Sequence, residues 1–310
     1  MGADWMGEDG VKLAVSALAD ESLVVLPTET VYGLAGLALS EVAVAKIFTA
    51  KGRPSHNPLI VHLGQVSDVV RVAVPANDRW QRLADALWPG PLTLVLPKHD
   101  SVPGIVTAGG DTVAVRIPAH PLFLRVLSEL GQPLAAPSAN IFTTLSPTRA
   151  QDVSLEIRAH TAGILDGGPC QVGIESTVLD LTTDVPRVLR RGVLSAATLS
   201  GVLGERVAEA SSEPAPNSPG QHPRHYAPRA TITFVEGHHN EPGLVFESAS
   251  SAQRLMPSDP SGYAQALYAA LASLDRAGEP HILVQRPPTT PEWDAVWDRL
   301  NRASYEPGGR

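Results

Sequence analysis

Cysteine, long apolar runs and a leader pattern are scarce or missing in this chain. Cys170 is the single cysteine among 310 residues, which excludes an internal disulfide and a zinc site built from cysteines. Its Gly-Gly-Pro-Cys setting is typical of a small structural thiol rather than a nucleophile. No run of about 18 apolar residues occurs, and the first residues, MGADWMGEDG, lack the basic-then-apolar order of a secretory signal. We therefore expect a cytoplasmic protein without a membrane segment.

Positive charge is also in short supply. The chain has 24 Lys and Arg against 32 Asp and Glu, a formal net charge of -8, and a sequence pI of about 5.7. Broad binding to a phosphate backbone needs many basic side chains on one face. Broad binding to nucleic acid is therefore not expected, and any anion that is recognised should be small and held locally.

The common phosphate-binding and hydrolase motifs are missing. The sequence contains no G-x-x-x-x-G-K-[ST], no G-x-G-x-x-G after a strand, no H-E-x-x-H and no G-x-S-x-G. A nucleotide site stays open, because amides, hydroxyls and arginines can hold phosphates in other arrangements. His222 and His225 have the spacing of metal ligands, but no acid or cysteine completes a set with His238 and His239, so polar linker residues are the favoured interpretation.

Short apolar runs alternate with helical patterns up to about residue 205. This alternation predicts an α/β domain built on one sheet. The expected strands lie at 23–27, 59–63, 92–97, 112–118, 176–181 and 187–190. The expected helices lie at 41–51, 77–88, 120–130 and 148–159.

A change of composition divides the chain. Residues 206–229 carry five prolines and few aliphatic side chains, which predicts a linker. The order β-β-α-β-α over residues 230–310 then indicates a second, smaller α/β domain.

Hydroxyl and basic side chains gather in the segments that flank the predicted strands. PTETVYGLAG (27–36) alone favours a connection in which Thr28 or Thr30 caps a following helix. In KGRPSHNPLIVHL (51–63), Lys51 and Arg53 are expected to project from a turn stiffened by prolines, either as a ligand grip or as a solvated basic turn. If the strands run parallel, these segments should meet in one crevice with the loops at 134–148 and 166–181.

Arg116 stands within the apolar run TVAVRIP. An unpaired buried guanidinium is costly, so Arg116 either faces water at a strand end or meets an anion. The nearest acids along the chain are Asp111 and Glu129. A substrate carboxylate is therefore the favoured partner, with an internal carboxylate as the alternative.

Seven motifs in a fixed order resemble the YrdC-like family: PTETVYGLAG, KGRPSHNPLIVH, WPGPLTLVL, VAVRIP, APSAN with SPT, GIESTV and LRRG. SPGQHPRHYAP and the trailing unit resemble its two-domain members. The resemblance implies a twisted mixed-sheet catalytic domain at 1–205, a proline-rich linker and lid at 206–229, and a Rossmann-like α/β domain at 230–310. Phe142-Thr143 departs from the family, which often has Ser-Gly there.

The resemblance also implies an activity. Members of this family condense L-threonine, bicarbonate or CO₂, and ATP into threonylcarbamoyl-AMP and pyrophosphate. Mg²⁺ would be held chiefly through the ATP phosphates, without a dedicated metal site on the protein. The product would pass to a separate tRNA threonylcarbamoyl transferase complex, which modifies the adenosine next to the anticodon.

Site residues follow from the same motifs. The positions implied to enclose threonine are Thr30, His62, Arg116, Ala136 and Ser176. The positions implied to hold ATP are Arg53, Asn57, Thr112, Ser138, Ser146, Arg190 and Tyr226. Lys51, Arg53 and Arg116 are the implied catalytic cations.

Two other function classes share parts of this pattern. An RNA-binding protein is disfavoured by the acidic charge and by the preserved linker, so direct binding to tRNA is expected to be weak or absent. A hydrogenase-maturation relative with the same domain would carry cysteine-rich zinc modules, which one cysteine cannot supply.

Overall fold

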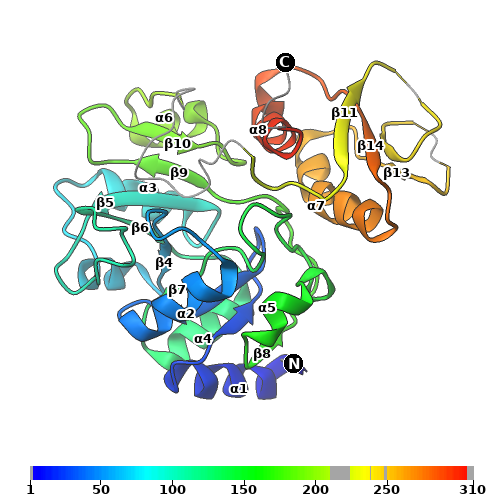
Figure 1. The fold of residues 1–310 in the computed structure, drawn as a ribbon. Helices are drawn as coiled ribbons and strands as arrows, with labels where there is room; N and C mark the ends of the chain where they lie inside the picture. Colours follow the sequence, from blue (N-terminus) through cyan, green and yellow to red (C-terminus); the bar gives the residue numbers. More distant parts are fainter. Residues whose placement is uncertain (1–2, 210–223, 238, 248–249, 306–310) are drawn as a thin grey trace.

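The computed structural model describes residues 3–209, 224–237, 239–247 and 250–305. Within these residues the chain forms two bodies, drawn blue to green and yellow to red in Figure 1. Most of the predicted lid, residues 210–223, lies outside the described residues, as do His222 and His238.

The first body is built on one mixed sheet, which confirms the predicted fold class. Its described strands follow the order β1-β8-β2-β3-β7-β4-β6-β5-β9-β10. The sheet combines parallel pairs such as β4 with β6 and antiparallel pairs such as β5 with β6. The strands are Ala3–Trp5 (β1), Val24–Leu26 (β2), Gly33–Leu37 (β3), Ile60–His62 (β4), Leu92–Pro97 (β5), Thr112–Arg116 (β6), Leu134–Ala135 (β7), Gly163–Leu165 (β8), Thr177–Asp180 (β9) and Arg187–Arg190 (β10).

Helices cover this sheet. The described α-helices of the first body are Gly7–Ala19 (α1), Glu41–Lys51 (α2), Arg79–Leu87 (α3), Pro121–Leu130 (α4), Leu155–Ala159 (α5) and Ala196–Leu203 (α6), with 3₁₀ turns at Val66–Arg71 (η1) and Ala150–Asp152 (η2). Local signals fix α2: the Ser40 hydroxyl accepts a hydrogen bond from the Ala43 amide, and Gly52 ends the helix with φ 57°. Lys51 is therefore the last helical residue.

The second body is a smaller α/β unit with a parallel sheet in the order β11-β14-β12-β13. Its described elements are Thr231–Val235 (β11), Gly243–Val245 (β12), Gln253–Leu255 (β13), Pro260–Arg276 (α7), His281–Gln285 (β14), Pro291–Trp293 (η3) and Asp294–Ala303 (α8). No helix in the described ranges is long and apolar enough to cross a membrane.

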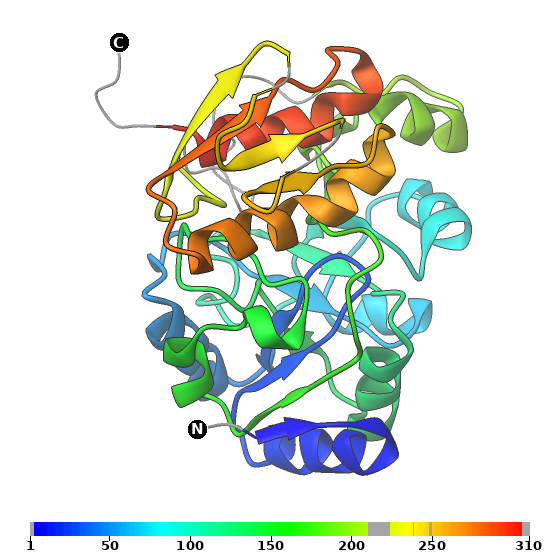
Figure 2. The same cartoon turned by 90° about the vertical axis from the view of Figure 1, so that its right-hand side faces the viewer.

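The two bodies share a packed interface, with α7 and α8 on the side that faces the first body (Figures 1 and 2). The core of the second body includes Val31, Ile174 and Tyr226 from outside its own elements. Gly173 has φ +79°, and a Cβ there would lie 2.4 Å from the Cα of Gln265 in α7. A residue larger than glycine would push α7 away from the loop that precedes β9.

Candidate active site

A pocket lies where loops from the first sheet meet the end of the linker. Its lining combines three arginines, one carboxylate and two histidines with small and apolar side chains: Thr30, Val31, Arg53, Pro58, Leu59, Ile60, His62, Arg116, Ala136, Pro137, Ser138, Glu175, Arg190, His225 and Tyr226. The predicted meeting of these distant segments is confirmed, although the sheet that gathers them is mixed rather than parallel.

His62 and Arg116 stand side by side at the ends of two strands. They are register partners in the parallel pair β4 and β6, so both side chains point to the same face of the sheet. Burial and the nearby Arg116 charge lower the pKa of His62 to about 3. The imidazole is therefore neutral at physiological pH, and its ring packs 5.3 Å from that of Phe123.

Arg116 has an internal carboxylate partner. Its Nη2 lies 2.7 Å from Glu29 Oε1, and its Nε donates to the Gly90 carbonyl at 3.2 Å. The preference for a substrate carboxylate as its partner is thus corrected, because the loop after β2 brings Glu29 across from a distant part of the chain. A contact between Arg116 and threonine stays a prediction.

The sequence of the loop after β2 favoured a following helix, but the loop does not lead into one. It turns into the antiparallel strand β3. The Thr28 and Thr30 hydroxyls lie 2.8 Å apart, and the Thr28 hydroxyl donates to the Val31 carbonyl at 2.7 Å. These bonds fix a tight loop, with Thr30 fully buried against the pocket.

Lys51 does not project from its turn. It is buried, and its ammonium donates to the carbonyls of Ser138 and Asn140 and to Asn140 Oδ1. The expectation of an outward-facing cation is wrong, because the helix continues through Lys51 and aims the side chain inward. The three N–H groups of the ammonium hold the loop that carries Ser138. A contact between Lys51 and phosphate stays a prediction.

Arg53 lines the pocket and is held by its own loop. Its Nη2 donates to Asn57 Oδ1 at 2.6 Å and to the Pro58 carbonyl at 2.9 Å. Its Nε donates to the Asn57 carbonyl at 3.1 Å. Burial lowers the pKa of Arg53 to about 9. Asn57 thus orients Arg53 rather than lining the pocket itself.

Arg190, at the end of β10, is oriented by Ser176. The Arg190 Nη2 donates to the Ser176 hydroxyl at 3.0 Å and Nε donates to its carbonyl at 3.1 Å. The same hydroxyl lies 2.8 Å from that of Thr93. Ser176 therefore sits behind Arg190, outside the pocket lining, while Ala136 and Ser138 lie on the surface of the pocket.

Thr112 lies apart from the other predicted residues. It lines a small neighbouring hollow with Pro58, Leu59, Thr107 and Ala114. It starts β6 whereas Arg116 ends it, so the two lie roughly 13 Å apart along the strand. A ligand that touched both would have to be elongated.

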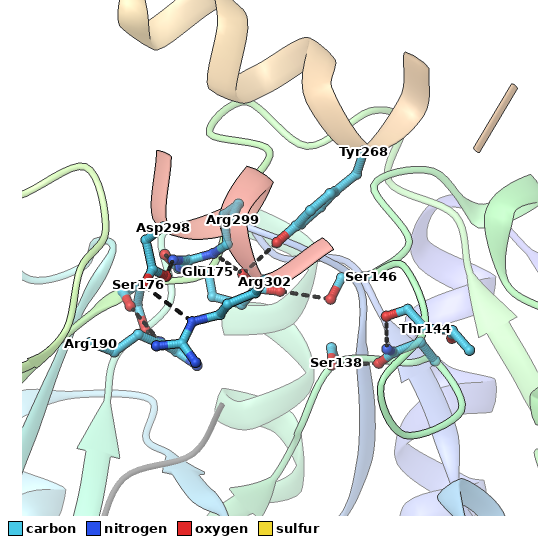
Figure 3. Close-up of polar contacts among 11 residues, drawn as sticks. Ser138, Thr144, Ser146, Glu175, Ser176, Arg190, Tyr268, Asp298, Arg299 and Arg302 are labelled. Carbon is cyan, nitrogen blue, oxygen red and sulfur yellow. Dashed lines mark hydrogen bonds and ion pairs between the residues drawn. The ribbon is translucent and has the colours of Figure 1, made fainter. Parts of the chain in front are cut away.

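Glu175 is a pocket residue to which the sequence analysis gave no role. Its Oε1 accepts a hydrogen bond from the Ser146 hydroxyl at 2.6 Å, and its Oε2 accepts one from Tyr268 at 3.0 Å. Arg299 Nε donates to Oε2 at 2.9 Å. Figure 3 shows Tyr268 and Arg299 reaching this carboxylate from helices α7 and α8. Ser146 is thus part of the support behind the pocket.

The linker end closes the pocket. Tyr226 is buried with φ +59°, and its hydroxyl has no hydrogen-bond partner among the described residues. Its ring lies 4.0 Å from that of His225 and 5.7 Å from that of Tyr268, centroid to centroid. Burial and the Arg53 and Lys51 charges hold the pKa of His225 well below its usual range. His225 is therefore a neutral pocket residue rather than a polar linker position.

A protein-built metal site finds no support in the described ranges. They hold no cluster of three or more His, Cys, Asp or Glu with a geometry for a metal ion. The two carboxylates nearest the pocket, Glu29 and Glu175, are each paired with an arginine. Cys170 is buried, and burial raises the pKa of its thiol to about 12, which suits a structural thiol.

Two protein-family models match successive regions of this chain. Residues 16–192 match the Sua5/YciO/YrdC family model, described as telomere recombination. Residues 193–304 match the model of the threonylcarbamoyl-AMP synthase C-terminal domain. This chain belongs to the Sua5/YrdC family. The boundary between the two matched regions falls just after β10, so the second match takes in α6 as well as the second body.

Curated members of the Sua5/YrdC family are similar over most of the chain. Threonylcarbamoyl-AMP synthase of Bacillus subtilis is 38% identical over 96% of this chain and 92% of its own length. The Pyrococcus abyssi protein of the same name is 45% identical over 73% of this chain and 68% of its own. The crystal structure of P. abyssi Sua5 complexed with L-threonine superposes with a TM-score of 0.89, at 35% identity, over 98% of this chain and 97% of the other.

Proposed function

We propose that this chain synthesises L-threonylcarbamoyl-AMP and pyrophosphate from L-threonine, bicarbonate or CO₂, and ATP, the first step of threonylcarbamoyladenosine formation in tRNA. The observation that carries the proposal is the pocket itself. One pocket is lined by a neutral histidine, a paired arginine and two further arginines, in a chain similar over most of its length to synthases of that name.

The amino acid is assigned to the end of the pocket formed by Thr30, His62 and Arg116. Glu29 and the Gly90 carbonyl hold Arg116 in place. A fixed guanidinium suits a carboxylate or carbamate, because its N–H groups match two oxygens at once. Ala136 leaves room beside them, and the relative complexed with L-threonine supports an amino acid here.

The nucleotide is assigned to the end that carries Arg53, Ser138 and Arg190. Both guanidiniums are buried and pre-oriented by neighbouring side chains, so little ordering is needed when phosphates bind. Thr112 would extend this subsite toward the rest of the nucleotide. Tyr226 closes the pocket from the linker side.

The reaction needs positioning and charge neutralisation more than a protein nucleophile. The threonine amine attacks CO₂ and loses a proton, which gives a carbamate. A carbamate oxygen then bonds to the α-phosphorus of ATP, the bond from that phosphorus to the bridging oxygen breaks, and pyrophosphate leaves. Arg53, Arg116 and Arg190 would offset the negative charge gathered in these steps.

Water must be kept from the carbamate and its adenylate, both of which hydrolyse. His225 and Tyr226 are buried over the pocket, and the second body packs behind them. The linker end would therefore act as the lid of a closed site.

Magnesium is proposed to enter with ATP. The carboxylates of Glu29 and Glu175 are each paired with an arginine, so phosphate oxygens would be its main ligands. It would supply charge neutralisation on the departing pyrophosphate. We further propose a cytoplasmic location and delivery of the adenylate to a tRNA threonylcarbamoyl transferase complex, since tRNA is the final acceptor.

The test is direct synthesis. The purified protein is mixed with ATP, Mg²⁺, bicarbonate and one amino acid at a time, and both pyrophosphate and the mass of the nucleotide product are measured. Threonine should give threonylcarbamoyl-AMP, and omission of bicarbonate or Mg²⁺ should stop its formation. Pyrophosphate release without the carbamoylated nucleotide, or equal turnover with every amino acid, would contradict the proposal.

A further inference from the structure

Arg299 is a fully buried arginine from the second body that reaches the pocket of the first. It lies on α8 and is 0% exposed. Its Nε donates to Glu175 Oε2 at 2.9 Å, and its guanidinium carbon lies 5.0 Å from the centroid of the Tyr226 ring. One side chain thus contacts both a pocket carboxylate and the linker residue that closes the pocket.

Glu175 connects Arg299 to the proposed nucleotide end. The carboxylate lines the pocket together with Arg53 and Arg190. Its other oxygen accepts the Ser146 hydrogen bond. The next residue along the chain, Ser176, orients Arg190 through its hydroxyl and carbonyl. A shift of Glu175 would therefore be felt at Ser146 and Arg190.

The charge of Glu175 needs an explanation in a site for a triphosphate. A buried carboxylate repels phosphates strongly where water cannot screen it. Burial alone would raise the pKa of Glu175, but the Arg299 and Arg190 charges and the Ser146 hydrogen bond lower it, so the group is ionised. Because Arg190 is also assigned to phosphate, we take Arg299 as the main balance for Glu175, with which its Nε pairs directly. The Arg299 Nη1 also pairs with Asp298 Oδ2 at 2.5 Å, and Asp298 in turn pairs with Arg302.

We propose that Arg299 is a positioning residue, supplied by the C-terminal domain, whose charge neutralises Glu175 and so lets the phosphates of ATP bind beside it. This inference rests on the proposed function. It gives the second body a direct part in nucleotide binding that an anchor for the linker would not need.

A purely structural role for Arg299 is the alternative. The chain offers a matched control, because Arg276 on α7 also bridges the two bodies, with Nη1 2.7 Å from Asp152 Oδ1. That arginine is half exposed and does not line the pocket. If bridging alone mattered, Arg276→Gln and Arg299→Gln would affect the enzyme in the same way.

The experiment compares four full-length proteins: wild type, Arg276→Gln, Arg299→Gln and the double variant Glu175→Gln/Arg299→Gln. Initial rates of threonylcarbamoyl-AMP formation give KM for ATP, KM for threonine and kcat. Arg299→Gln should raise KM for ATP about tenfold or more, because it leaves an unbalanced buried charge. KM for threonine should change much less, and Arg276→Gln should resemble wild type.

The double variant is the decisive arm. Glutamine at 175 keeps an acceptor for Ser146 but removes the charge, so KM for ATP should return toward the wild-type value. If Arg299→Gln does not fold, the double variant carries the test, with Arg299→Lys as the charge-conserving variant. The proposal is overturned if the folded double variant has a KM for ATP as high as that of Arg299→Gln, or tenfold above that of Arg299→Lys. An unchanged KM for ATP in Arg299→Gln also overturns it. Failure of the wild-type protein to form the product would instead refute the proposed function.

Discussion

At the scale of single residues, burial decides which side chains of the pocket carry charge. Lys51, Arg53 and Arg190 have lowered pKa values, with burial as the largest cause in each. His62 and His225 are held neutral by burial and nearby cations. The site is therefore a set of restrained cations beside neutral rings, which suits anionic substrates.

His62 makes stability depend on pH in a defined direction. Its folded pKa of about 3 lies below its ordinary value of 6.5, so the unfolded chain binds the extra proton between these values. The stabilisation is present above pH 6.5 and is lost as pH falls toward 3. Between pH 7 and pH 5, wild type should lose about 2 kcal/mol more stability than His62→Gln, measured by denaturant unfolding. Identical pH slopes for the two proteins would contradict this.

Thr143 has a strained backbone conformation. Its φ is +74°, a region that β-branched residues rarely occupy. Glycine tolerates this φ without a steric penalty, so Thr143→Gly should relieve the strain and stabilise the protein by about 1 kcal/mol. Thermal unfolding of Thr143→Gly and of the neighbouring Thr144→Gly measures the effect. A loss of stability in both variants would show that this backbone is not strained at Thr143.

At the scale of elements, α2 fixes the loop that follows β7. The Lys51 ammonium binds three oxygens of Ser138 and Asn140, and the Lys51 carbonyl accepts the Phe142 amide hydrogen at 2.9 Å. The Thr143 carbonyl in turn accepts a hydrogen bond from the Ala227 amide of the linker at 3.0 Å. One helix end thereby positions both the pocket loop and the end of the linker.

Removing this anchor should cost stability. Lys51→Met leaves buried carbonyls without their donors, and we expect the free energy of unfolding to fall by about 3 kcal/mol. Lys46→Met is the control on the same helix, since Lys46 is exposed and donates to the Glu21 carbonyl; it should cost under about 1 kcal/mol. Denaturant unfolding measures both. Equal losses would argue that Lys51 has no special structural part.

Elements differed in how well the sequence alone specified them. The runs at 92–97 and 187–190 became strands with those bounds, because each has a β-branched residue beside leucine and is bounded by proline, glycine or charged residues. Strand β7 has two residues and β13 has three, too short to show a period. Helix α1 was missed because its N-terminus has no side-chain cap to mark it.

At the scale of the whole molecule, the two bodies meet through a buried network rather than a loose contact. Val31 and Ile174 pack into the core of the second body, and Arg299 pairs with Glu175. The pocket loops on either side of these residues are thus tied to α7 and α8. Ligand binding in the pocket should be felt in the second body.

Hydrogen exchange can detect this coupling. Saturating ATP should slow amide exchange in α8 (Asp294–Ala303) as well as in the loops around Arg53 and Ser138, because binding to the native state suppresses local opening. Helix α1 (Gly7–Ala19), which contributes no residue to the pocket lining and lies at the opposite end of the molecule from α8 (Figure 2), should be unaffected. Protection confined to the first body would show that the second does not respond to the nucleotide.

The amino-acid sequence by itself determined the α/β class, most strands and helices of both bodies, and the set of hydroxyl and basic segments that form the pocket. Local periodicity and turn chemistry suffice for these, since they act over a few residues. Only the tertiary structure decided which charged side chains pair with one another. Glu29 meets Arg116 and Glu175 meets Arg299 across long stretches of chain. In the sequence, Arg299 is marked only by its spacing from Val296, Leu300 and Ala303, which places it on the buried face of α8. Which buried charge faces which is set by packing, and no local pattern records it.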